Sequence, residues 1–353
     1  MKGLMKVGIL RNINDIRCEE SEIPQIKADE ILIKVKCAGI CGTDFERVLK
    51  TGTWKFPTIL GHEFGGKIVK VGTDVVGHQI GDKVVVNPMV PCGRCKYCEV
   101  GKFNLCDDYD YLGSRSSGGF AEYAKVKYKN AYTVPNSLTH EQIAGIDPAA
   151  IALHGIIRGE VKVGDTVVVF GAGPIGHYTI QWAKHVGASK VIAVDLRDEK
   201  LKIAQEIGAD HTLRVDTVDD VVKEIEKLTE GNWADVTYET AGSDITVTQC
   251  IQAAKKQGSV VYLGTPHRDI LLKDKVFESI IRKELKVVGS WCYHFSAPVH
   301  EWKVTIDEIA KGNIQVEPLI THKFSVADID KAFDMIRERK EFFNKILIYA
   351  GGK

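Results

Sequence analysis

Four cysteines that lie close together in the sequence carry its clearest chemical signal. They are Cys92, Cys95, Cys98 and Cys106, with the spacing C-x2-C-x2-C-x7-C. Thiolates are soft ligands, and four of them suit a tetrahedral zinc ion with no open position, which is a structural site. Iron–sulfur ligation is the competing interpretation of clustered cysteines. A closed zinc site does no chemistry itself, so we expect it to stabilise a loop that has little apolar core.

A second group of potential ligands is dispersed along the chain. Cys41, the pair His62 and Glu63, and Asp147 offer a thiolate, an imidazole and two carboxylates. These are ligand types that metal sites use, but no short spacing links the four residues. A buried cysteine, a core histidine and a solvated carboxylate are therefore the alternative interpretations of the same residues.

A glycine-rich segment predicts a dinucleotide site. Gly171, Gly173 and Gly176, with Pro174 and Ile175 between them, form the pattern G-x-G-x-x-G. The segment follows a predicted strand and opens a predicted helix. In that context the glycines allow a tight turn, close approach of a pyrophosphate and close helix–strand packing. A glycine-rich turn without a ligand is the alternative.

The residues after the next predicted strand indicate which dinucleotide would bind. Asp195 ends that strand, about 20 residues beyond the last glycine, where a carboxylate accepts hydrogen bonds from the ribose hydroxyls. This position favours NAD over NADP. Arg197 lies close by, and an arginine there could instead hold a 2′-phosphate.

Two kinds of predicted architecture must position these residues. The first 145 residues read as short strands bounded by Gly, Asp and Pro, with no competing long helical pattern. Examples of these strands are 31–36, 67–71 and 83–86. From about residue 149 strands alternate with helices, which predicts a parallel, doubly wound sheet. The strands are expected at 166–170, 191–194, 211–215, 234–238 and 260–263, and the helices at 175–186, 198–207, 219–228 and 246–256. Helices at 300–310 and 326–339 and a closing strand at 344–349 follow a less regular stretch after residue 289.

Composition narrows the class of protein. The chain has 353 residues, enough for two domains, and its 47 basic and 47 acidic residues give no net charge. A general nucleic-acid binder would show a basic excess, so we expect no nucleic-acid partner. The sequence contains no run of about 18 apolar residues, so we expect no membrane helix, and no secretory signal is visible.

The odd number of cysteines, nine, fits reduced thiols and a cytoplasmic location. Four cysteines stand apart from the motifs and are expected to pack as small apolar residues: Cys18, Cys37, Cys250 and Cys292.

In order and spacing, these motifs resemble the zinc-dependent medium-chain dehydrogenases, the family of alcohol, sorbitol and threonine dehydrogenases. The resemblance covers essentially the whole chain and rests on segments 39–44, 61–66 and 118–123, the four-cysteine loop and the nucleotide pattern. It implies a GroES-like β-barrel catalytic domain at 1–149 and 290–353, with a Rossmann NAD-binding domain inserted at 150–289. It also implies a homodimer or homotetramer.

Within the family, the chain is similar to the polyol branch, and to enzymes of galactitol 1-phosphate in particular. The similar segments are 109–115, 263–269, 281–285 and 289–291. The implied reaction, of class EC 1.1.1, is the NAD-linked oxidation of a secondary hydroxyl of a sugar-alcohol phosphate. Galactitol 1-phosphate would give tagatose 6-phosphate, and arabitol phosphate is a related substrate. A dehydrogenase of a free polyol such as sorbitol, or of L-threonine, is the alternative, and a non-catalytic nucleotide-binding protein on the same fold is a second one.

The resemblance assigns the dispersed ligands to a catalytic zinc, held by Cys41, His62 and either Asp147 or Glu63. With the four-cysteine site this makes two zinc ions per subunit. The polyol branch usually has glutamate where this chain has Asp147, which is one methylene shorter. Because a carboxylate replaces a second thiolate, the site is harder, which could broaden the choice of metal toward manganese or cobalt.

Proton transfer and phosphate binding need further residues. Thr43, two positions after Cys41, is implied as a proton relay, with a local backbone hydrogen bond as the alternative. Glu46 stands where the alcohol dehydrogenases have a relay histidine, so we expect the proton to leave through water. Arg115 is the first candidate for a phosphate ligand, because a guanidinium can hold phosphate with two hydrogen bonds. Further candidates are Arg47, Lys50, His267 and Arg282.

Overall fold

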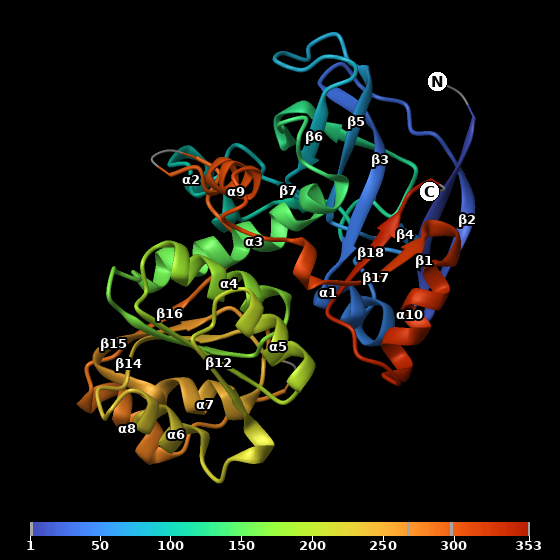
Figure 1. Ribbon diagram of the computed structural model, residues 1–353. Coiled ribbons are helices and arrows are strands. Elements are labelled where there is room, and N and C mark those ends of the chain that lie inside the picture. Colours follow the sequence, from blue (N-terminus) through green and yellow to red (C-terminus); the bar gives the residue numbers. More distant parts are fainter. Residues whose placement is uncertain (1–2, 267, 297–298, 352–353) are drawn as a thin grey trace. The chain divides into compact units, whose positions relative to one another are not determined.

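The computed structural model describes residues 3–266, 268–296 and 299–351 of the chain (Figure 1). These form two compact units. Unit 1 comprises Met1–Asp147, Phe295–Ala310 and Ile320–Lys353, and unit 2 comprises Pro148–His294 and Lys311–Leu319. The sequence places the domain boundaries at 149/150 and 289/290, and assigns 311–319 to the catalytic domain. That segment groups with unit 2 because Gln181 donates to the carbonyl of Gln315 (3.0 Å) and accepts from its backbone N–H (2.6 Å).

Unit 1 is built on a seven-stranded sheet with the order β10-β6-β5-β3-β18-β17, in which β9 also pairs with β3. The strands are β3 (Glu30–Ile40), β5 (Glu63–Val71), β6 (Lys83–Val86), β9 (Tyr123–Lys127), β10 (Ala131–Thr133), β17 (Ile320–Ser325) and β18 (Lys345–Tyr349). The predicted strands at 31–36, 67–71 and 83–86 are confirmed within β3, β5 and β6, and the closing strand within β18. Because β18 pairs antiparallel with β3, the C-terminal segment returns to the sheet of the N-terminal one.

Smaller elements complete unit 1. A three-stranded sheet has the order β2-β1-β4, from Asp15–Glu22, Leu4–Asn12 and Thr58–Ile59, and β7 (Met89–Val90) pairs with β8 (Asp110–Tyr111). The expected C-terminal helices appear as α9 (Glu301–Ala310) and α10 (Ile329–Glu338). A shared apolar core joins the sheets to α10, with Phe64, Phe120 and Phe333 fully buried.

Unit 2 is the expected doubly wound fold. Its six parallel strands have the order β13-β12-β11-β14-β15-β16. Successive strands are added toward one edge from β11 to β13 and toward the opposite edge from β14 to β16, so the order switches between β11 and β14. The strands are β11 (Thr166–Phe170), β12 (Lys190–Asp195), β13 (His211–Arg214), β14 (Ala234–Glu239), β15 (Ala254–Tyr262) and β16 (Lys286–Gly289). The helices between them are α4 (Pro174–His185), α5 (Asp198–Glu206), α6 (Val221–Leu228), α7 (Asp244–Ala253) and α8 (Asp274–Arg282), of which α6, α7 and α8 gather along one side of the sheet (Figure 1).

Two expectations about helices need correction. A long helix, α3 (His140–Gly159), begins where the sequence predicts only strands and turns, and it contains Pro148. Conversely, the helix expected at 246–256 ends at Ala253, where strand β15 begins directly. Among the described residues no helix has both the length and the hydrophobicity that a bilayer crossing requires.

Candidate active site

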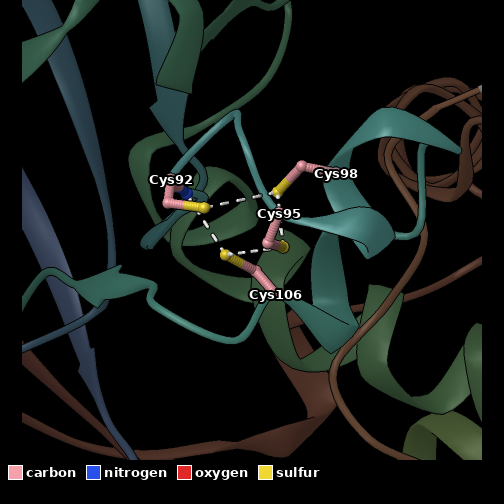
Figure 2. Close-up of side chains that lie close together, drawn as sticks. All are labelled: Cys92, Cys95, Cys98 and Cys106. Atoms are coloured by element: carbon pink, nitrogen blue, oxygen red, sulfur yellow. Dashed lines mark hydrogen bonds between the residues drawn. The ribbon is translucent and has the colours of Figure 1, made fainter.

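The four cysteines of the loop between β7 and β8 meet at one point (Figure 2). Their sulfurs lie within 4.8 Å of one another, with separations of 3.6 Å between Cys95 and Cys98, 3.9 Å between Cys95 and Cys106, and 4.0 Å between Cys92 and Cys98. Four sulfurs at 2.3 Å from a central ion would lie about 3.8 Å apart, so the cluster fits one tetrahedral zinc. All nine cysteines are free thiols, which leaves these sulfurs available to a metal.

The loop also favours the charged form of two ligands, since backbone N–H groups lower the pKa of both Cys92 and Cys95. The backbone N–H of Asp107 and further backbone donors lower the pKa of Cys95 to about 6, whereas burial raises the pKa of Cys98 to about 12. Cys95 caps the single-turn helix α2 (Lys96–Glu99), so its sulfur lies beside unpaired N–H groups. Of the four cysteines outside the motifs, Cys37, Cys250 and Cys292 are buried as expected, and Cys18 is half-buried.

A second cluster joins Cys41, His62 and Glu63, whose ligand atoms also lie within 4.8 Å of one another. Cys41 follows the end of β3 and caps the short helix α1 (Gly42–Glu46), while Glu63 begins β5. The antiparallel register of β3 and β5 sets Gly39 opposite Glu63. A side chain at Gly39 would collide with the Glu63 carboxylate, so only a glycine leaves room for that carboxylate here. Thiolate, imidazole and carboxylate together are a donor set that fits a catalytic zinc.

Asp147 lies buried on α3. Among the described residues, the group whose ligand atoms all lie within 4.8 Å of one another contains Cys41, His62 and Glu63 but not Asp147. Its charge nevertheless acts on Lys345, which is part of the same region. Asp147 therefore belongs to the electrostatic surroundings of the cluster in this structure.

Lys345 is a partner of the cluster that the sequence does not reveal. Its ammonium group, buried at the start of β18, donates to both carboxylate oxygens of Glu63 (2.7 and 2.9 Å) and to the carbonyl of Ile40 (3.2 Å). Burial by itself would lower the pKa of Lys345, but the negative charges of Glu63, Cys41 and Asp147 outweigh it and raise that pKa. The pair is thus a buried ion pair that holds Glu63 in place.

Asp44 holds the other side of the cluster. Its fully buried carboxylate accepts from the backbone N–H of Cys41 (3.0 Å) and from Arg47 Nη1 (3.3 Å), and its Oδ1 lies 3.6 Å from His62 Nδ1. Burial would lower the pKa of His62, but the charges of Asp44 and Cys41 prevail and raise it well above its usual range. Nδ1 of His62 thus faces the carboxylate of Asp44, which orients the imidazole ring and leaves Nε2 as the nitrogen for a metal. Arg47 Nη1 also donates to the hydroxyl oxygen of Thr43 (2.9 Å).

Among the phosphate candidates, Arg115 lies in unit 1 against the rings of Trp54 and Tyr109. Lys50 pairs with Glu46, and Arg282, in unit 2, pairs with Glu278. His267 lies outside the described residues.

The glycine turn in unit 2 has the form that its sequence predicts. Gly171 has a φ of 97°, in the left-handed region, and a side chain at Gly176 would collide with the carbonyl of Gly171. Gly173 caps α4, and Pro174 is its first residue, so the N–H groups at the start of α4 remain unpaired. Such a helix start binds phosphate groups.

Asp195 joins this turn to the next strand. Its Oδ2 accepts from the backbone N–H of Ala172 (2.7 Å), and its Oδ1 accepts from those of Leu196 (2.8 Å) and Arg197 (3.0 Å). Lys200 Nζ lies 3.7 Å from the same carboxylate. The Asp195 carboxylate is therefore held directly beside the glycine turn, and Arg197 follows it as the cap of α5.

Glu239, at the carboxyl end of β14, is a second residue that no sequence motif marks. Its buried Oε1 accepts from the backbone N–H groups of Ala241 (2.9 Å) and Gly242 (2.8 Å) and from the hydroxyl of Thr246 (2.7 Å). The next residue, Thr240, donates to the carbonyl of Gly171 (2.6 Å). Glu239 thus shapes the loop that supports the glycine turn.

Comparison with known proteins supports both units. The family described as "Alcohol dehydrogenase GroES-like domain" matches residues 27–136, and the family "Zinc-binding dehydrogenase" matches residues 174–311. Galactitol 1-phosphate 5-dehydrogenase of Escherichia coli K12 is 36% identical over 319 residues, which are 90% of this chain and 92% of that one. Sorbitol dehydrogenase of Bacillus subtilis 168 is 30% identical over 350 residues, covering 98% and 97%.

A solved structure agrees with these sequence relatives. The crystal structure of galactitol-1-phosphate dehydrogenase from Escherichia coli has a TM-score of 0.92 and 35% identity, covering 98% of this chain and 99% of that one. The predicted GroES-like and Rossmann architecture is confirmed by these matches. The chain therefore belongs to the family of zinc-binding alcohol and polyol dehydrogenases, oxidoreductases for which zinc and a nicotinamide dinucleotide are the expected cofactors.

Proposed function

We propose that this enzyme oxidises a secondary hydroxyl of a sugar-alcohol phosphate with NAD, and that galactitol 1-phosphate, which would give tagatose 6-phosphate, is its substrate. The observation that carries the proposal is the turn of residues 111–116. It lies against the backbone of Gly61 and His62, beside the Cys41–His62–Glu63 cluster, and it bears the guanidinium of Arg115. Relatives that act on galactitol 1-phosphate support the same choice.

The cluster residues would hold the catalytic zinc, with Cys41 and His62 as two ligands and Glu63 or Asp147 as the carboxylate. When bound, zinc supplies a positive charge that lowers the pKa of an alcohol and polarises a carbonyl. Asp44 fixes the ring of His62 from one side, and Lys345 fixes Glu63 from the other. Manganese and cobalt are the alternative metals to test, because a carboxylate hardens the donor set.

Thr43 is the residue that would pass on the proton of the substrate hydroxyl. Its oxygen already accepts a hydrogen bond from Arg47, so its own proton is free to be donated elsewhere. Glu46 occupies the position of a relay histidine and pairs with Lys50. The proton would therefore pass from Thr43 to water.

The dinucleotide would be held by unit 2. The N–H groups at the start of α4, following Gly171, Gly173 and Gly176, would bind the pyrophosphate, and Asp195 would accept hydrogen bonds from the ribose hydroxyls. The nicotinamide supplies the hydride acceptor. The carboxylate of Asp195 repels a 2′-phosphate, whereas Arg197 attracts one, and we propose that Asp195 prevails in favour of NAD.

An activity screen after reconstitution with zinc tests this function. Initial rates with NAD and with NADP are compared for galactitol 1-phosphate, galactitol, sorbitol and L-threonine. We expect kcat/KM for galactitol 1-phosphate to exceed that for each other substrate by at least tenfold, with NAD preferred. An equal or higher kcat/KM for sorbitol, which the sorbitol dehydrogenase relative makes the second candidate, would contradict the proposal.

We also propose that the chain forms a homodimer or homotetramer and works in the cytoplasm, where its thiols stay reduced. Strand β16 forms one end of the unit 2 sheet, and edge strands offer unpaired backbone groups to a partner. Apolar side chains are exposed there and on α8, at Val287, Phe277 and Ile281. Light scattering after gel filtration should give two or four times the chain mass of 39.0 kDa. Val287→Lys should reduce the measured mass of the assembly. A monomeric wild-type protein would contradict this assembly.

A further inference from the structure

The guanidinium of Arg115 is held by two aromatic rings. Its central carbon lies 3.9 Å from the ring centroid of Tyr109 and 4.4 Å from that of Trp54. Its Nη1 donates to the carbonyl of Tyr109 (2.5 Å). Contacts of a cation with ring faces are attractive and restrict the planar group to one orientation.

The turn that carries Arg115 is fixed against the candidate metal ligands. The carbonyl of Tyr111 accepts hydrogen bonds from the backbone N–H groups of Ser114 (3.2 Å) and Arg115 (2.9 Å). A side chain at Gly113 would lie 2.5 Å from the carbonyl of Gly61 and 3.0 Å from the backbone nitrogen of His62, so the two segments touch. The ring of Tyr111 meets the ring of His62 edge to face, with centroids 5.7 Å apart. Arg115 thus belongs to a turn that contacts the candidate metal ligand His62.

Trp54 comes from a separate segment that forms a small closed turn. The carbonyl of Lys55 accepts from the hydroxyls of both Thr53 (2.7 Å) and Thr58 (2.5 Å). This arrangement leaves Trp54 at the tip of the turn with 76% of its surface exposed. The face of this exposed indole contacts the guanidinium of Arg115.

Charge distinguishes Arg115 from the other phosphate candidates. Among the described residues Arg115 forms no ion pair, and its side chain donates one hydrogen bond, from Nη1 to the carbonyl of Tyr109, so that Nη2 and Nε have no partner there. The other described candidates each have a carboxylate partner, because Arg47 pairs with Asp44, Lys50 with Glu46 and Arg282 with Glu278. Arg115 therefore keeps both its charge and two donors for an anion, and the fork of a guanidinium matches the oxygens of phosphate.

We propose that Trp54, Arg115 and Tyr109 form the site that recognises the phosphate group of the substrate, and that Trp54 is a specificity-determining residue. The indole holds the guanidinium with its free donors pointing to the anion, so that a phosphomonoester is preferred to a neutral polyol. This inference rests on the proposed function, since it requires a phosphorylated substrate.

The test compares kcat/KM for galactitol 1-phosphate with kcat/KM for galactitol in the zinc-loaded enzyme. Arg115→Met should lower the ratio of the two values by about 10- to 100-fold, because charge-assisted hydrogen bonds are lost. Arg115→Lys, which keeps the charge but loses the fork, should fall between Arg115→Met and the wild type. Trp54→Leu should lower the ratio by about 2- to 5-fold, the effect of one cation–π contact. Arg17→Met, on the exposed face of β2, is the matched control and should leave the ratio unchanged.

A second measurement separates this inference from the proposed function. Inorganic phosphate is used as a competitive inhibitor, and its inhibition constant should rise in Arg115→Met by the same factor as the ratio falls. If the wild type prefers galactitol 1-phosphate but Arg115→Met keeps that preference, the function stands and this site is wrong. An equal fall in kcat/KM for galactitol 1-phosphate and for galactitol would also overturn this inference, because Arg115 would then have a structural role. If the wild type shows no preference, the proposed function fails, and phosphate inhibition that depends on Arg115 would still support an anion site.

Discussion

The two ligand clusters of unit 1 are alike in size but differ in what surrounds them. Both bring their ligand atoms within 4.8 Å of one another. The four-cysteine cluster draws every ligand from one short loop, 92–106, and backbone N–H groups are its main partners. The Cys41–His62–Glu63 cluster draws its ligands from the ends of two strands and is enclosed by the charged side chains of Asp44 and Lys345.

The difference follows from the chemistry of the ligands. Thiolates around one ion form a closed, locally folded site that needs no distant residue. A buried carboxylate and imidazole must be compensated by opposite charges, because isolated buried charge is very costly. A site that keeps a coordination position open for substrate therefore depends on the whole fold of unit 1.

The strongest test of this contrast is Cys41→Ala. We expect the variant to retain one metal per chain, at the four-cysteine site, and to lose at least about 1000-fold in kcat/KM, since metal catalysis contributes several kcal/mol. Elemental analysis and initial rates are measured on the same preparation. Loss of both metals would show that the two clusters are not independent.

Cys98→Ala should remove the metal of the four-cysteine site instead, and its main effect should be on stability. The buried thiol is lost from the closed site, so we expect loss of one metal and of roughly 5 kcal/mol or more of stability, given the large folding contribution of structural zinc. Urea unfolding followed by circular dichroism measures this change. A variant that loses the metal without a change in unfolding midpoint would contradict a structural role for the cluster.

Lys345→Met tests the charged surroundings of the mixed cluster. It leaves the Glu63 carboxylate buried without its ammonium partner, which should cost roughly 3–5 kcal/mol in the free energy of unfolding. Because the pKa of Lys345 is raised, the wild-type pair should contribute throughout the neutral range and be lost only as the pH rises beyond the usual lysine value. Lys345→Arg keeps the charge and is the matched control.

A double variant shows whether the cost of Lys345→Met comes from the stranded carboxylate. Adding Glu63→Gln to Lys345→Met should restore part of the lost stability, since the uncompensated charge is removed. Strictly additive losses would mean that the two groups do not interact, contrary to their 2.7 Å contact.

The sequence predicts those parts of the sites that a short segment determines. The four cysteines and the glycine turn are specified by spacing within one loop, and the structure brings each set together. Lys345 lies 282 residues from Glu63 and belongs to no motif, so their pairing emerges only when β18 joins β3. Likewise, the sequence names Arg115 as a phosphate candidate, but its contact with Trp54 emerges only when the fold brings the two turns together.

The fold follows the same rule. Alternating strands and helices predict the parallel sheet of unit 2 because each element is defined by its own local pattern. Helix α3 does not follow from its sequence, because Pro148 lies in its middle and proline normally ends a helix. The sequence places Lys311–Leu319 in the catalytic domain, because no local signal reveals its hydrogen bonds to Gln181.

The smallest predicted loss of stability extends the comparison to two buried histidines. Asp44 and Cys41 raise the pKa of His62, whereas burial lowers the pKa of His177, on α4, to about 4. The unfolded chain takes up a proton at this histidine below about pH 6.5, but the folded chain does so only near pH 4. Stability should therefore fall as the pH drops through this range, by up to about 3 kcal/mol from this residue.

Urea unfolding of the wild type and of His177→Gln between pH 7 and pH 4 measures the difference. His177→Gln should show the shallower decline, while His185→Gln, at an exposed position of the same helix, should match the wild type. Equal slopes for His177→Gln and the wild type would mean that this histidine does not titrate as a core residue, and the contrast with His62 would then be lost.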